Sequence, residues 1–397
     1  MVKARNLSKL LQRSLQRSTS GRFIPVIDGL RFFAIMPVIF LHASTAFLEY
    51  SSLYDYDAVG KTEWLRVAFL TGGAGVLIFF AISGFILTLP FAKHHLEGTN
   101  PVSLRSYTKR RLIRLEPPYL LTLVGLFFVH LLLQTESFSE LLPHFLASSF
   151  YLHNIVYGEW SVINPVAWSL EIEIQFYLLM PLLGQVFLLK KVPRRLLLFA
   201  LIGLAPLAHM LPLDQWHLDK SLLSHYPYFL AGILAADFYL EKDLRLTWSL
   251  NTLLIALSLP LIFVVEHYGG DYRFLLPLVI LAFVLASLNG SYFKGFLEHP
   301  LVTIIGGACY ITYLIHYPLL HLLARVGLYT GAGDNFTADI VVYLLIVVPI
   351  VLAISLAAFV LVEKPFMLMS QGKLRGRLQS LWERFSATRL SRQTPTD

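Results

Sequence analysis

The chain has 397 residues, of which 56% are hydrophobic and only 14% are charged. Soluble proteins carry about 25% charged residues, so this composition excludes an ordinary soluble enzyme and indicates a polytopic membrane protein. Cys309 is the one cysteine, which excludes a disulfide framework and a cysteine metal cluster. Membrane topology and lipid contact explain the net charge of +7, so no nucleic-acid partner is expected.

Apolar stretches of membrane-spanning length recur along most of the chain. We expect a basic cytoplasmic arm over 1–23 that lies against anionic lipid, a membrane domain over 24–366 and a basic cytoplasmic tail over 367–397. The predicted fold is all-α, a polytopic membrane helix bundle without an appended soluble catalytic domain. Ten transmembrane helices are predicted, at about 24–47, 67–91, 117–134, 164–189, 196–212, 224–240, 247–267, 273–290, 301–328 and 338–362.

The lysines and arginines fall mostly on one side of these spans. If the N-terminus is inside, 26 of the 32 lie in inside segments. The positive-inside rule then places both termini in the cytoplasm, which agrees with an even number of spans.

The stretch 27–44 places an arginine and a histidine inside an otherwise apolar segment. Arg31 and His42 are eleven residues apart, so at about 100° per residue they share one side of a helix, roughly 16.5 Å apart. An ionisable group in the bilayer costs about 2.5 kcal/mol or more, so the favoured interpretation is a functional pair on one interior path. Alternatively, Arg31 lies at headgroup level and His42 bonds a neighbouring helix.

The second span and the loop after it carry two further patterns. The small residues of the span let helices approach closely, and this structural role is favoured for Gly72, Gly73, Gly75, Ser83 and Gly84. In the loop, Arg111 and Arg114 are one helical turn apart, which suits two guanidinium groups binding one phosphate-rich ligand. From the loop alone, positive-inside anchoring is favoured for both arginines.

The fourth span begins with polar residues on two faces of the helix. One stripe carries Trp168, Glu171 and Gln175, and the other carries Ser169, Glu173 and Tyr177. We therefore expect protein or water to enclose this helix end, which topology places in the outer half of the membrane, where His42 also lies. Alternatively, the polar groups only bond adjacent helices. The preceding region, 134–165, is expected to form a partial or interfacial helix.

In the ninth span, Tyr313 and His316 are three residues apart on one face, and Pro318 is expected to kink the helix. His321 is predicted to lie elsewhere on that helix. The interior histidines show no close metal-ligand pattern, so no metal is expected, although His42 and His316 could meet in three dimensions.

Six short motifs occur in a fixed order along the chain. They are DGLR with His42, FF-x-x-SGF of the second span, Arg111-x-x-Arg114, W-S-L-x-x-E-x-Q-F-Y at 168–177, Y-x-x-Y-L-x-H-x-P at 310–318 and E-K-P-F at 363–366. In this order they resemble those of membrane acyltransferase family 3, over residues 24–366. Two departures from the family are visible: Cys309 replaces a frequent serine, and Ile174 replaces a frequent acidic residue.

The resemblance implies an O-acyltransferase with ten spans that modifies sugars or glycoconjugates. It places the protein in the plasma membrane of a bacterium, that is, the inner membrane. It implies acyl-CoA, most often acetyl-CoA, as co-substrate, with no tightly bound cofactor. We expect His42 to act as a general base on an acceptor hydroxyl or as a transient acyl carrier. Glu173 is then expected to orient His42 or that hydroxyl.

The other site residues follow from the same motifs. The donor is expected to bind Arg31, Arg111, Arg114 and Ser83. The acceptor side is expected to be lined or supported by Trp168, Tyr313, His316, Glu171 and Asp28.

Of two other functions considered, a transporter is compatible with ten spans and interior charges and a scaffold is not. A transporter or lipid-linked sugar flippase would use Arg31, His42 and Glu173 as a coupling path. A scaffolding protein does not explain polar groups on three separate spans. The sequence leaves open the acceptor, the acyl chain, the side from which the acceptor enters and the oligomeric state.

Overall fold

The computed structural model describes residues 15–18, 23–54, 71–208, 217–244, 246–329, 331–333 and 335–372. Every secondary-structure element in these ranges is a helix, so the predicted all-α class is confirmed. The arm predicted over 1–23 and the tail predicted over 367–397 lie largely outside the described residues.

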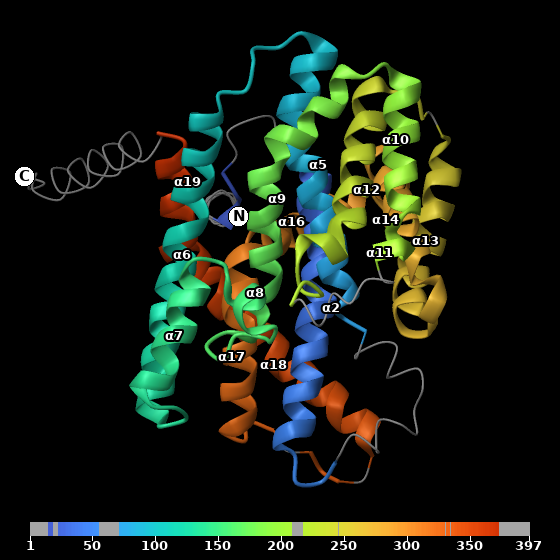
Figure 1. Cartoon of the computed structure of the whole chain (residues 1–397). Coiled ribbons are helices and arrows are strands. Elements are labelled where there is room, and N and C mark those ends of the chain that lie inside the picture. The colour runs from blue at the N-terminus through green and yellow to red at the C-terminus, as the bar shows by residue number, and fades with distance from the viewer. Residues whose placement is uncertain are drawn as a thin grey trace, which may run out of the picture.

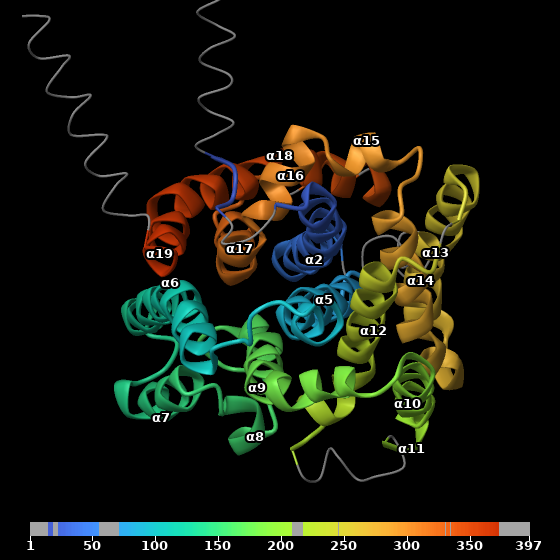
Figure 2. The same ribbon diagram turned by 90° about the horizontal axis from the view of Figure 1, so that it is seen from above.

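Two helices, α2 (Pro25–Tyr50) and α5 (Ala74–Glu97), lie in the middle of the molecule, and the other helices surround them (Figure 2). Glycines let them pack closely. A Cβ atom on Gly75 would lie 2.1 Å from the carbonyl oxygen of Ala34 in α2, and one on Gly84 would lie 2.3 Å from that of Phe229 in α12 (Leu222–Glu241). The structural role predicted for these two glycines is therefore confirmed, whereas Gly73 has nothing within 4 Å.

One side of the bundle is built by α6 (Leu104–Leu133), α7 (Phe138–Ser149) and α8 (His153–Tyr157). A capping box between Ser137 and Glu140 starts α7, which runs back beside α6 (Figure 1). The region 134–165 therefore returns into the bundle, and the next helix begins inside it. That next segment consists of η1 (Pro165–Ala167), α9 (Trp168–Leu183) and η2 (Gly184–Leu188).

The opposite side contains α12 (Leu222–Glu241), which packs on α5, and α10 (Lys191–Gly203). A buried ion pair joins them, because Arg194 Nε donates to Asp237 at 2.7 Å. The other elements on this side are α11 (Ala205–Ala208), α13 (Trp248–Tyr268), η3 (Gly270–Leu275) and α14 (Leu276–Leu288). The mostly buried α14 contacts both α12 and α13.

The C-terminal third packs along α2. The pair α16 and α17 is bent by 72°, and η4 is a π-helical turn. The elements are α15 (Lys294–Leu297), α16 (Pro300–Gly307), α17 (Cys309–Arg325), α18 (Phe336–Ala358), η4 (Phe359–Glu363) and α19 (Lys364–Ser370).

The described residues form a multi-pass arrangement of apolar helices, as predicted. Six helices are long and apolar enough to cross a membrane, or seven if the bent α16–α17 pair counts as one span. The predicted number, ten, is not reached, partly because α10 and α14 have 13 residues each. Such helices cover about 20 Å of a hydrocarbon core about 30 Å thick. The cytoplasmic placement of both termini stays a prediction.

Candidate active site

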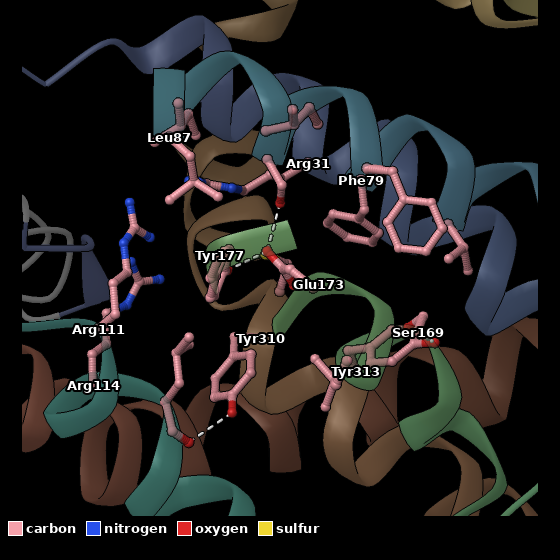
Figure 3. A pocket seen from close by; sticks show the side chains of 18 of the residues that line it. Arg31, Phe79, Leu87, Arg111, Arg114, Ser169, Glu173, Tyr177, Tyr310 and Tyr313 are labelled. Atoms are coloured by element: carbon pink, nitrogen blue, oxygen red, sulfur yellow. Dashed lines mark hydrogen bonds between the residues drawn. The ribbon is translucent and has the colours of Figure 1, made fainter. Parts of the chain in front are cut away.

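A cavity lies between α2, α5, α6, α9 and α17, and Glu173 projects into it (Figure 3). The Glu173 carboxylate accepts a 2.5 Å hydrogen bond from Ser83 Oγ and another from the hydroxyl of Tyr177. Both donors also line the cavity, so α5 and α9 are joined at its wall. The apolar part of the lining includes Phe79 and Leu87. A half-buried carboxylate with two hydroxyl donors is thus set in a largely apolar chamber.

Three of the predicted donor residues, Arg31, Arg111 and Arg114, line the same cavity. Arg111 and Arg114 enter it from α6 (Figure 3), and the Arg111 guanidinium lies 5.5 Å from the ring centroid of Tyr177. Arg31 comes from α2. The structure therefore brings together all four residues that were assigned to the donor, since Ser83 is the fourth.

Two buried carboxylates hold Arg31 and Arg114 in place. Asp28 is 2% exposed and accepts a hydrogen bond from Arg31, one turn further along α2. Glu363 is fully buried, lies 3.9 Å from the guanidinium of Arg114 and accepts a 3.1 Å hydrogen bond from the backbone N–H of Ile311. A buried cation without a partner is costly, so these carboxylates make an arginine-lined chamber possible.

The chamber continues into a wider cavity at the basic end of the bundle, where α2 and α6 begin and α5 ends. The two cavities share Arg31, Arg111 and Arg114. Six cationic residues and one carboxylate line the wider one. A surface groove with Lys93, Lys109 and Arg110 in its lining adjoins it. A run of positive charge therefore extends from the surface to the Glu173 chamber. Anions are attracted along such a path.

A second group of side chains surrounds His42. Its ring centroid lies 5.2 Å from that of His316 and 5.1 Å from that of Tyr317, both on α17. The ring of Tyr313 lies 5.5 Å from His316, and its hydroxyl accepts a 2.7 Å hydrogen bond from Ser169. Tyr313 and Ser169 line the Glu173 chamber, whereas His42 is not among its lining residues. Tyr313 and His316 thus lie between the chamber and His42.

A family model described as an acyltransferase domain, that of acyltransferase family 3, matches residues 24–360 of this chain. The chain belongs to this family. It is 28% identical over 337 residues to O-acetyltransferase OatA of Staphylococcus aureus, with the same values for strains NCTC 8325, COL and N315. The alignment covers 78% of this chain and 52% of each OatA sequence, so the chain spans about half the length of these curated relatives. No solved structure gives a significant match.

Within this family member, the predicted polar cavity shared by Glu173, Tyr313, His316 and His42 is present only in part. Glu173 and Tyr313 share a cavity. The hydrogen-bond partners of Glu173 in the described residues are Ser83 and Tyr177, and His42 is not one of them. The role predicted for Glu173, to orient His42 or the acceptor hydroxyl, therefore stays a prediction. Because the chain re-enters the bundle before α9, Glu173 lies beside Ser83, one of the residues predicted for the donor.

Three residues predicted to line or support the acceptor side do not line the chamber in this family member. Glu171 is fully buried and accepts a 2.8 Å hydrogen bond from the backbone N–H of Asn154, so it supports α8. Trp168 packs against His225, with ring centroids 5.5 Å apart, and does not line the chamber. Asp28 lies at the basic end and supports Arg31. Each of these residues packs against or bonds a neighbouring segment, and their role in lining or supporting the acceptor side stays a prediction.

Glu363 is the residue that sequence reasoning missed. Its EKPF motif was recognised, but no role was assigned to the glutamate. An acidic residue at the end of a long apolar segment was the available signal. Within the part of the chain that the structure describes, no group of three or more His, Cys, Asp or Glu side chains is placed to hold a metal ion.

Proposed function

We propose that the protein is an integral-membrane O-acyltransferase that moves an acyl group, expected to be acetyl, from cytoplasmic acyl-CoA to a hydroxyl of a sugar or glycoconjugate. The observation that carries this proposal is the run of positive charge that ends in a chamber around Glu173. Membership of the acyltransferase family and the O-acetyltransferase names of its relatives support it. We assign the protein to a bacterial inner membrane with both termini in the cytoplasm.

The charge distribution suits a donor that carries several phosphates. Arginine binds phosphate oxygens through two parallel N–H groups, and the basic end supplies Arg110, Arg111 and Arg114 from one helix. The phosphates would remain near the cavity mouth, and the long uncharged arm of the donor would extend into the apolar chamber. The thioester then arrives between Glu173 and Tyr313, on the way to His42.

His42 supplies the chemistry in this proposal. Imidazole titrates near neutral pH and is nucleophilic, so it can take a proton from the acceptor hydroxyl or carry the acyl group. Tyr313 and His316 line the acceptor side, and Glu173 holds the hydroxyls of Ser83 and Tyr177 at the donor side. No resident cofactor or metal is required.

The test is label transfer by the purified full-length protein in lipid nanodiscs. Acetyl-CoA labelled in the acetyl group is added with a membrane glycoconjugate extract of the producing cells, and His42→Ala is the matched control. We expect alkali-labile label on the extract or on the protein, together with free CoA, and neither product from the control. If the wild type produces no label and no CoA, but moves lipid-linked sugar across vesicles, the protein is a transporter.

A further inference from the structure

His316 has its ring fixed in one orientation by the backbone of its own helix. Its Nδ1 lies 2.8 Å from the carbonyl oxygen of Tyr313 and 3.2 Å from that of Thr312. A carbonyl oxygen can only accept a hydrogen bond, so Nδ1 must carry the proton. The other ring nitrogen, Nε2, therefore has a free lone pair in the neutral ring, and it points away from the backbone of α17.

This lone pair has no hydrogen-bond partner. His316 is fully buried, and its Nε2 is a buried atom without a partner among the described residues. An unpaired buried acceptor is destabilising, so the site favours a ligand that brings a hydroxyl or another hydrogen-bond donor. The ring of His42, on the adjacent α2, lies 5.2 Å away, centroid to centroid. The lone pair is therefore next to the residue to which the acyl chemistry is assigned.

We infer that Nε2 of His316 is the atom that receives the acceptor hydroxyl and takes its proton. This inference rests on the proposed acyltransferase function and divides the work between two histidines. His316 acts as the base, and His42 faces the acyl group. The hydroxyl oxygen forms the ester bond to the acyl carbon while its proton moves to Nε2. In direct transfer the bond between the acyl carbon and the donor sulfur breaks, and the proton passes from His316 to that sulfur. If His42 carries the acyl group, the bond between the acyl carbon and the His42 nitrogen breaks, and the proton passes to that nitrogen.

Two substitutions separate this role from a purely structural one. Asparagine places an amide N–H near the position of Nδ1 and can keep the hydrogen bonds to the carbonyls, but it removes the acceptor at Nε2. Glutamine places an amide oxygen near the position of Nε2 and can still accept a hydroxyl, although it cannot take the proton. Both are assayed with labelled acetyl-CoA and varied amounts of the membrane glycoconjugate extract.

We expect turnover to fall at least about 10²-fold in both variants, because a general base contributes about 10²–10⁴-fold. The amount of extract for half-saturation should stay within about threefold of wild type in His316→Gln and should rise at least about tenfold in His316→Asn. The control is His130→Asn, at the far end of α6, where Nδ1 lies 2.8 Å from Thr135 Oγ1. This variant should behave as wild type.

The opposite order overturns the inference. If His316→Asn keeps wild-type turnover and His316→Gln loses it, the histidine serves only to bond the helix backbone. Should His316→Asn fail to fold, as judged by thermal unfolding, His316→Ala with added imidazole decides the question. A rescue of at least about tenfold supports a base at this position, and no rescue refutes it. Absence of label transfer by the wild type would instead refute the proposed function.

Discussion

The hydroxyl of Ser83 donates a 2.5 Å hydrogen bond to the carboxylate of Glu173, although 90 positions separate the two residues in the sequence. Tyr177, one helical turn beyond Glu173, donates to the same oxygen. Two neutral hydroxyls from α5 and α9 therefore define the surroundings of this carboxylate, and His42 is not one of its partners. The Glu173 chamber lies next to the pair of histidines, His42 and His316, and Tyr313 contacts both the chamber and His316.

The Ser83 bond predicts a moderate loss of activity. Ser83→Ala should lower turnover about tenfold, since a hydrogen bond to a charged group contributes about 1.5–3 kcal/mol. Tyr177→Phe should act similarly, and the double variant should deviate from additivity because both hydroxyls share one oxygen. Steady-state label transfer measures the effect. Ser149→Ala, in α7, is the control, and wild-type turnover in both single variants would contradict the prediction.

His42→Ala should remove turnover while leaving the fold and donor binding near normal. The expected loss is at least about 10²-fold, whether the His42 ring takes a proton or faces and carries the acyl group. Turnover, thermal unfolding and binding of labelled acetyl-CoA are measured on the same preparation. Activity within a few-fold of wild type would refute a catalytic role for this histidine.

Arg111→Lys should weaken donor binding, because lysine keeps the charge and the topology signal but loses the planar pair of donors. We expect the KM for acetyl-CoA to rise about tenfold with little change in turnover at saturation. Arg105→Lys, an exposed position on the same helix outside the described cavities, is the matched control. If the double variant Arg111→Lys and Arg114→Lys keeps the wild-type KM for acetyl-CoA, the two arginines do not bind the donor and serve only the membrane topology.

The close packing at Gly84 predicts that Gly84→Ala and Gly125→Ala differ in stability, which can be measured without an activity assay. A Cβ at this position would lie 2.3 Å from the carbonyl oxygen of Phe229, so Gly84→Ala should destabilise the packing of α5 on α12 by about 1–3 kcal/mol. Gly125→Ala, inside α6, meets nothing within 4 Å and should be neutral or stabilising by up to about 1 kcal/mol. Thermal unfolding of both variants in nanodiscs checks the pair. Equal stability would mean that α5 and α12 are not in close contact.

The sequence by itself determined the all-helical membrane class and predicted four residues that line one cavity, Arg31, Ser83, Arg111 and Arg114. Composition is enough for the class, because apolar segments of this length are stable only in a membrane. The three arginines were singled out because arginines in or beside apolar segments are costly and must have partners. The family motifs added the order in which the functional segments occur, and the family model over 24–360 confirms that assignment.

Only the tertiary structure decided which polar residues meet. Spacing along α9 placed Glu171 and Glu173 on two stripes of the helix. The return of α7 and α8 into the bundle then puts Asn154 beside Glu171, while Glu173 projects into the chamber. The counterion of Arg114 comes from Glu363 at the far end of the chain. Such pairings depend on contacts between distant segments, which helical periodicity does not encode. The same holds for His42 and His316: each was visible in the sequence, and the packing of α17 on α2 brought their rings together.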